Sequence, residues 1–214
     1  MKEFISKTAH TLIPVSIDAS VDTVFPLVSP IEEYKWIPGW KCKLIHYPRD
    51  IIALGAIFYE ISSAPFLIGN YNGKTTWTVV EYEPENYKLH FRLDNKKSSS
   101  LYKIELSDDG QGKTKGNLDF TYTAINKKGN QLVVDKVEDK IHIMLSVLYT
   151  LLKYYSENNK LLSSAELRKM IPLEEMLSIK DKILVLVNRL AKSKMIDNDR
   201  ERFLKKFQAN EING

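Results

Sequence analysis

The segment QLVVDKVEDKIHIMLSVLYTLLKYY, residues 131–155, carries a helical pattern along its whole length. Its apolar residues recur at intervals of three or four positions, at Val133, Val137, Ile141, Met144, Leu148, Leu151 and Tyr155. This spacing predicts one continuous amphipathic helix about 33 Å long, at about 1.5 Å per residue. A helix of that length is able to lie across a whole sheet, and the segments before it predict such a sheet.

Six segments upstream have the length and residue types of β-strands. They span residues 42–47, 56–62, 74–82, 87–93, 101–107 and 116–125, separated by turn signals such as Asn72-Gly73 and Asp108-Asp109-Gly110. In the fourth segment, apolar residues alternate with Lys88, His90 and Arg92. This alternation predicts an antiparallel sheet with one solvated face, which includes His90, and one apolar face beneath the long helix.

The chain before these strands predicts another strand and two short helices. Residues 11–17 alternate as a strand, and residues 21–29 form a short helix that Asp18 or Ser20 is placed to cap. Residues 29–40, SPIEEYKWIPGW, predict a second short helix, which Pro38-Gly39 must end. The order of elements is strand, two short helices, six strands and a long helix, which predicts an α+β fold.

Composition describes an ordinary globular chain of 214 residues, with 43% hydrophobic and 27% charged residues. The N-terminus has no apolar run of signal-peptide length, and no stretch approaches the roughly 18 apolar residues that span a bilayer. We therefore expect a cytoplasmic protein without stable membrane insertion. Cys42 is the single cysteine, so neither an intrachain disulfide nor a cysteine zinc site is available.

Charge and aromatic content change near residues 156–160. Residues 1–159 hold 19 of the 31 Lys and Arg and 19 of the 27 Asp and Glu, so the whole excess of +4 lies in residues 160–214. The latter segment predicts a basic helical extension, in which Ser163 and Glu166 fit a capping box. We expect residues 163–207 to pack against protein, either their own domain or the same element of a second subunit in a homodimer. A membrane or nucleic-acid contact is the disfavoured alternative, because acidic residues are interspersed.

The sequence contains no complete motif for covalent catalysis, nucleotide binding or metal binding. Gly112-Lys113-Thr114 resembles part of a phosphate-binding loop, but the first glycine of that motif is replaced by Ser107. Cys42 and His46 would lie roughly 13 Å apart along a strand, too far to be a nucleophile and its base. The four histidines show no metal-binding spacing, and no pair of inward-facing carboxylates stands out. We expect no metal, no cofactor and no identifiable catalytic residue.

The order of elements, with VDTVFPLVSPIEEYKWIPGW, TWTVVEYEPENYKLHF and DFTYTAINKKGNQLV in succession, resembles the START-like, or SRPBCC, superfamily of polyketide cyclases/dehydrases and lipid-transfer proteins. The resemblance covers residues 8–157. It implies a helix-grip fold, an antiparallel sheet curved around a long C-terminal helix, with residues 160–214 as an additional helical extension. It also implies a cavity whose rim includes the two short helices. Tyr34, Trp36 and Trp40 are then expected near the mouth, although core packing is the competing interpretation.

The predicted function is non-covalent binding of a hydrophobic or amphipathic small molecule, such as a lipid or a polyketide-like compound. Strand alternation and the helix pattern nominate the ligand-binding residues, of which His46, Tyr102 and Tyr122 are expected to orient the ligand by hydrogen bonding. The full set is Tyr34, Trp36, Trp40, His46, Phe58, Trp77, Phe91, Tyr102, Phe120, Tyr122, Met144 and Leu148. Two alternatives stay open: a cyclase or dehydratase for a polyketide-like substrate, and an interaction protein that acts through its helical extension.

Overall fold

Seven antiparallel strands form one sheet in the order β1-β7-β6-β5-β4-β3-β2. The computed structural model describes residues 3–38, 40–48, 52–60 and 75–162. The strands are β1 (Thr8–Ile17), β2 (Cys42–His46), β3 (Ile57–Glu60), β4 (Thr75–Glu83), β5 (Lys88–Asp94), β6 (Ser99–Asp108) and β7 (Thr114–Thr123). The helices are α1 (Val21–Val24), η1 (Phe25–Val28), α2 (Glu33–Trp36), η2 (Pro84–Asn86), α3 (Lys127–Val134) and α4 (Val137–Asn158).

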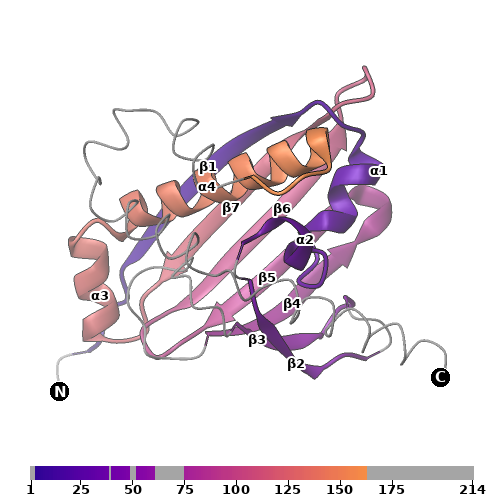
Figure 1. Cartoon of the computed structure of the whole chain (residues 1–214). Helices are drawn as coiled ribbons and strands as arrows, with labels where there is room; N and C mark the ends of the chain where they lie inside the picture. The colour runs from indigo at the N-terminus through magenta and orange to yellow at the C-terminus, as the bar shows by residue number, and fades with distance from the viewer. Residues whose placement is uncertain (1–2, 39, 49–51, 61–74, 163–214) are drawn as a thin grey trace.

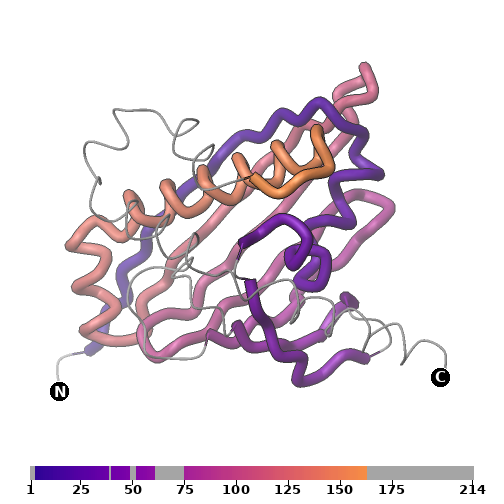
Figure 2. The backbone as a smooth tube through the Cα atoms, viewed as in Figure 1, coloured from indigo at the N-terminus to yellow at the C-terminus, as the bar shows by residue number. Residues whose placement is uncertain are grey.

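The curved sheet and the long helix form the helix-grip architecture predicted from the sequence. Figure 1 shows α4 lying across one face of the sheet, with α3 at one end and α1 and α2 at the other. We call the face toward α4 the inner face. The chain trace makes the same arrangement visible without the ribbons, as the strands run beneath α4 as adjacent tubes (Figure 2).

Alternation in β1 and β6 places one side of each of these strands in the core. In β1 every second residue is buried, from Ala9 to Ile17. In β6 the buried residues are Ser100, Tyr102, Ile104 and Leu106, all of the same parity. A side chain on a strand points to the face opposite that of its neighbours, so these residues share the inner face with α4.

The predicted continuous helix over residues 131–155 is wrong, because the structure breaks it at Asp135 and Lys136. Helix α3 ends at Val134, and Lys136 takes a left-handed conformation with φ +55° before α4 begins. A left-handed residue cannot continue an α-helix. The apolar spacing nevertheless runs across the break from Val133 to Val137, which is why periodicity alone predicted one helix.

Close packing at the start of α3 fixes the direction of this helix. A Cβ atom on Gly129 would lie 2.2 Å from the carbonyl oxygen of Lys97 and 3.0 Å from the Cβ of Ala124. Glycine at this position therefore lets α3 approach the chain beside the end of β7. The side chain of Asn126 caps α3 by accepting a 3.0 Å hydrogen bond from the Gly129 amide. The helix direction is fixed here, and the chain must turn before α4 can cross the sheet.

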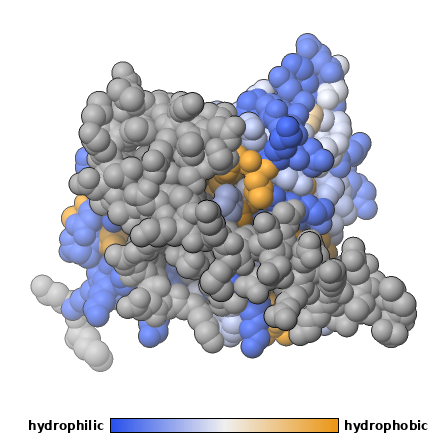
Figure 3. All heavy atoms as spheres, in the orientation of Figure 1, coloured by the Kyte–Doolittle hydropathy of each residue, from blue (hydrophilic) through white to orange (hydrophobic). Residues whose placement is uncertain are grey.

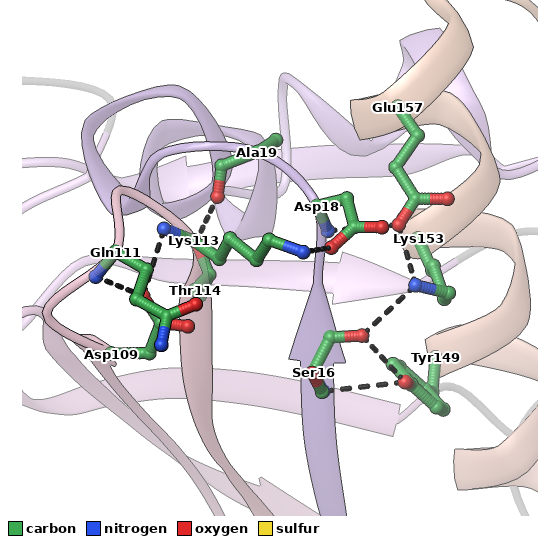
Figure 4. Close-up of polar contacts among 10 residues, drawn as sticks. All are labelled: Ser16, Asp18, Ala19, Asp109, Gln111, Lys113, Thr114, Tyr149, Lys153 and Glu157. Atoms are coloured by element: carbon green, nitrogen blue, oxygen red, sulfur yellow. Dashed lines mark hydrogen bonds and ion pairs between the residues drawn. The ribbon is translucent and has the colours of Figure 1, made fainter.

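A polar network ties the C-terminal half of α4 to the end of β1 (Figure 4). The Tyr149 hydroxyl donates to the Ser16 carbonyl at 2.8 Å, and the Asp18 amide donates to the Glu157 carboxylate at 2.8 Å. Lys113 of the β6–β7 turn pairs with Asp18 at 2.6 Å. The Lys113 side chain, part of the segment that resembles a phosphate loop, thus connects the β6–β7 turn to the end of β1.

The expected helical extension, residues 160–214, lies outside the described residues from residue 163 onward. On the described surface, hydrophilic residues dominate the face shown in Figure 3, with an apolar area near its centre. None of the helices within residues 3–38, 40–48, 52–60 and 75–162 is long and apolar enough to cross a membrane.

Candidate functional site

Five aromatic side chains from consecutive strands form a continuous surface on the inner face. We call this set the aromatic wall: Phe58, Trp77, Phe91, Tyr102 and Phe120, one each from β3 to β7. Neighbouring rings lie close together, with centroids 5.5 Å apart for Phe58–Trp77, 5.4 Å for Trp77–Phe91, 6.4 Å for Phe91–Tyr102 and 5.9 Å for Tyr102–Phe120. The structure thus brings together five of the predicted ligand-binding residues.

Tyr34, Trp36 and Trp40 hold the segment around α2 in place, and we call them the α2 anchor. Their side chains are buried, whereas a side chain at the mouth of a cavity is expected to keep its polar edge in water. The Trp36 indole donates to the Leu27 carbonyl at 2.7 Å, and the Trp40 indole donates to the Pro30 carbonyl at 2.7 Å. The Tyr34 hydroxyl accepts from the Cys42 amide at 2.8 Å. All three polar groups therefore serve the main chain.

Trp77 contrasts with the anchor because its indole N–H is buried without an acceptor in the described part of the chain. The hydroxyl of Ser100, also on the inner face, is likewise buried and without a partner among those residues. Leu93 pairs with both residues across the sheet, so Trp77 and Ser100 lie in one row of three strands. Buried polar groups in folded proteins are paired in the great majority of cases, so these two point to an acceptor from elsewhere.

Glu33 is a functional candidate that the sequence did not reveal. It lies on α2, is only 8% exposed, and its carboxyl has no hydrogen bond or ion pair to any described residue. Burial raises the pKa of this carboxyl well above its ordinary value, and the nearby Glu60 raises it further. The sequence analysis singled out no inward-facing carboxylate, and the structure places the Glu33 side chain in the interior.

Tyr102 is a buried hydroxyl within the aromatic wall. Burial raises the pKa of its hydroxyl strongly, with a smaller contribution from Glu33. Its ring centroid lies 6.4 Å from that of Trp77. The wall thus carries a second polar group close to the unpaired indole of Trp77.

Cys42 and His46 behave differently from one another, although both lie on β2. Burial raises the pKa of the Cys42 thiol to about 12, so the thiolate needed for nucleophilic attack is absent at neutral pH. His46 is exposed, and the prediction that it faces inward is wrong. The pairing of β2 with β3 shifts between Leu44 and His46, which breaks the alternation on which that prediction rested.

The remaining predicted residues lie around the aromatic wall. The Tyr122 hydroxyl approaches the Gly129 carbonyl at 3.5 Å, toward α3, where it serves the main chain. Met144 is buried on α4, and Leu148, one turn further along, is half-buried. That these residues and the aromatic wall enclose a cavity of ligand size stays a prediction.

His90 lies on the outer face of the sheet, as alternation predicts, but it is buried, with only 6% exposure. Its Nδ1 lies 2.7 Å from the Glu81 carboxylate, and its Nε2 lies 3.0 Å from the Glu105 carboxylate. A shift in register between Val79 and Glu81 brings Glu81 opposite His90. The expectation of a solvated histidine is therefore wrong, since two cross-strand neighbours cover the ring.

A separate cleft of about 410 Å³ opens between η1 and the adjoining ends of β4 and β5. Its lining is mostly apolar and aromatic, with a few polar residues: Asp22, Phe25, Pro26, Ser29, Glu32, Ile52, Tyr82, Pro84, Tyr87 and Leu89. None of the predicted ligand-binding residues belongs to this set. The cleft is thus distinct from the aromatic wall.

Within the described ranges, no group of three or more His, Cys, Asp or Glu side chains is arranged to hold a metal ion. The histidine with two carboxylate neighbours, His90, is placed between them, so its two ring nitrogens point to opposite partners. The arrangement at the inner face offers hydrogen-bond donors and a buried acid beside aromatic rings.

Solved structures share this fold at low sequence identity. A norcoclaurine synthase point mutant from Thalictrum flavum, in complex with a transition-state analogue, matches with a TM-score of 0.54 and 11% identity, covering 72% of this chain and 97% of its own. An aromatase/cyclase from a Streptomyces species matches with a TM-score of 0.51 and 8% identity, covering 73% of this chain and 100% of its own. These similarities establish the fold.

The sequence itself identifies the family. No curated protein matches the chain. The family described as polyketide cyclase/dehydrase and lipid transport matches residues 9–145, which is more than half of the chain and includes every predicted ligand-binding residue except Leu148. The chain therefore belongs to the polyketide cyclase/dehydrase and lipid transport family.

Proposed function

We propose that the protein binds a hydrophobic or amphipathic small molecule, without covalent chemistry, between the inner face of the sheet and α4. The observation that carries this proposal is the pair of buried polar groups, Trp77 Nε1 and Ser100 Oγ, that lack partners in the described part of the chain. A buried donor left unpaired costs about 1–3 kcal/mol. An acceptor on a bound molecule would remove this cost.

The aromatic wall supplies the apolar contribution to binding. Apolar surface removed from water contributes about 25 cal/mol per Å², and flat rings on five adjacent strands provide such a surface. Small-molecule sites combine apolar walls with a few placed polar groups that fix the orientation of the ligand. Trp77, Ser100 and Tyr102 match that description, and the family description, which includes lipid transport, is consistent with it.

Native mass spectrometry of the purified full-length chain tests the proposal first, as a co-purified apolar compound would add a defined mass. A titration with Nile red, an uncharged dye that fluoresces in apolar surroundings, tests it independently. We expect saturable binding of one dye per chain and displacement by a ten-carbon methyl ketone. Neither added mass nor saturable dye binding would contradict the proposal.

A matched pair of variants locates the dye. Met144→Trp adds an indole on the buried side of α4, whereas Val134→Trp adds the same group on α3 at a position that is 56% exposed. We expect Met144→Trp to weaken Nile red binding at least tenfold, because it occupies space between α4 and the sheet. Equal affinity in the two variants, both folded by circular dichroism, would place the dye elsewhere.

A second candidate function is catalysis of a cyclisation or dehydration on a polyketide-like substrate. The observation that favours it is the buried Glu33 carboxyl, whose pKa is raised well above its ordinary value by burial. A raised pKa favours the protonated form, and a protonated carboxyl is suited to act as a general acid. If Glu33→Gln abolished turnover of a polyketide-like substrate while ligand affinity stayed within a few fold, this candidate would replace simple binding.

A further inference from the structure

Two adjacent glutamates on and before α2 have opposite surroundings. Glu32 forms an ion pair with Lys35, and its side chain remains partly exposed. Glu33 is buried, and its carboxyl forms neither a hydrogen bond nor an ion pair with the residues that the structure describes. The chain thus carries a built-in comparison between a surface glutamate and an interior one.

The Glu33 carboxyl pairs with no cationic side chain among the described residues. Its helix, α2, contacts α4, and Trp40, which follows α2, contacts Trp77 with ring centroids 6.1 Å apart. Burying a carboxylate without a cation is costly, so the group keeps its proton instead. The pKa of Glu33 is raised accordingly, mainly by burial. A protonated carboxyl has an O–H that donates a hydrogen bond.

Donors also predominate among the unpaired groups of the inner face. The indole N–H of Trp77 is a donor only, and the Ser100 hydroxyl is able to donate. With the protonated Glu33 carboxyl, the interior therefore presents several donors, and no described cationic side chain pairs with Glu33. This environment favours an uncharged oxygen atom and disfavours an anion.

We propose that Glu33 selects the ligand: the interior site accepts an uncharged amphiphile that presents an acceptor oxygen, such as a ketone, ester or alcohol, and rejects the carboxylate of equal chain length. The inference deepens the proposed function, on which it rests, because both concern the same site. An uncharged oxygen takes up the free donors. A carboxylate would have to be buried beside Glu33, whose own carboxyl pairs with no cation among the described residues.

Competition against Nile red on the full chain at neutral pH tests this selection. The two competitors are the ten-carbon methyl ketone and decanoate, which have the same number of carbon atoms. We expect the ketone to displace the dye at a concentration at least about tenfold lower than decanoate. Equal displacement by the two competitors would overturn the inference and leave the proposed function standing.

Three variants assign the selection to Glu33. Glu33→Gln keeps a neutral donor, so we expect its ketone affinity to stay within about twofold of the wild type. Glu33→Ala removes the donor and should weaken ketone binding by about three- to tenfold, the range expected for one hydrogen bond. Glu32→Gln is the matched control and should change neither affinity.

The results with the variants and competitors separate the role of Glu33 from the proposed binding function. Unchanged ketone affinity and unchanged selection in Glu33→Ala would overturn the role of Glu33. Rescue by Glu33→Gln, together with loss in Glu33→Ala, separates hydrogen bonding from a general packing defect. If Nile red and both competitors failed to bind the wild type, the proposed function itself would fail, and the inference with it.

Discussion

Trp40 and Trp77 are neighbours with opposite surroundings. Their ring centroids lie 6.1 Å apart in an edge-to-face contact, and both side chains are buried. The Trp40 indole donates to the Pro30 carbonyl, whereas the Trp77 indole has no acceptor in the described part of the chain. The two tryptophans are equally buried but differ in role. The difference is whether the indole N–H has an acceptor within the described chain.

The same difference separates the α2 anchor from the aromatic wall. The polar atoms of Tyr34, Trp36 and Trp40 complete main-chain hydrogen bonds near α2. By contrast, Trp77 on the inner face and Glu33 on α2 are left without a partner among the described residues. A buried polar group that completes the main chain stabilises the fold, while one left open is available to a ligand. The following predictions test that distinction.

The largest effect is expected in the anchor. Trp36→Ala removes a buried indole and its hydrogen bond to Leu27, so we expect the free energy of unfolding to fall by about 3–5 kcal/mol. Urea denaturation measures it. Val134→Ala, at an exposed position of α3, serves as the control and should stay within about 0.5 kcal/mol of the wild type. Equal effects in the two variants would mean that the anchor does not stabilise the fold.

Paired substitutions test whether the two tryptophans differ in role. Trp40→Phe leaves the buried Pro30 carbonyl without its donor, which costs about 1–3 kcal/mol in the absence of ligand. Trp77→Phe breaks no hydrogen bond to the described chain, so its unfolding free energy should be about 1 kcal/mol higher than that of Trp40→Phe. Thermal or urea unfolding of the ligand-free proteins measures both. The reverse order would contradict the assignment of roles.

Glu33 should make stability depend on pH in a defined direction. Its pKa is raised in the folded state above the value of 4.5, mainly by burial, so the unfolded chain loses this proton first as the pH rises. The contribution is fully present below about pH 4.5 and is lost as the pH rises toward the folded-state pKa. Relative to Glu33→Gln, the wild type should lose up to about 1.4 kcal/mol per pH unit in that window.

Urea denaturation of both proteins at intervals from about pH 4 to pH 7 measures this dependence. The difference between the two proteins isolates Glu33 from all other titrating groups. A constant difference across the window would show that Glu33 ionises alike in the folded and unfolded states, which contradicts an apolar interior at this position.

The smallest effect is expected on the outer face. Glu105→Gln weakens an interaction with His90, but the Glu105 side chain is 48% exposed, so the loss should be below about 1 kcal/mol. Because this position lies on the face opposite the aromatic wall, Nile red affinity should not change. A reduced affinity in a variant of unchanged stability would show that the two faces are coupled.

Much of the fold could be predicted because local patterns and tertiary packing agree. Alternation in the strands placed Phe91, Tyr102 and Phe120 correctly on one face, as their pairing in β5, β6 and β7 confirms. The break at Lys136 could not be predicted, because apolar spacing continues across it while Gly129 fixes α3 through contacts with a distant segment. Periodicity reports which face is apolar but not the direction of the helix axis.

The site was less predictable, because it depends on register. His46 was predicted to face inward and His90 to be solvated. Both predictions failed because strand pairing shifts beside each residue, and a sequence pattern does not show such shifts. Glu33 was not singled out from the sequence. The available signal was its place beside Tyr34 and Trp36 in a helix of only four residues. Whether a side chain has a partner is a property of the packed structure alone.

The three indole N–H groups of this chain provide the most direct test of the account. Their nitrogen-15 resonances, assigned with Trp36→Phe, Trp40→Phe and Trp77→Phe, are followed while the ten-carbon methyl ketone is added to ligand-free protein. The account predicts that the Trp77 N–H shifts most as it gains an acceptor, while those of Trp36 and Trp40 keep their main-chain bonds and shift little. Saturable binding that leaves the Trp77 resonance in place would put the ligand elsewhere, for example in the cleft beside η1, and would contradict the central claim.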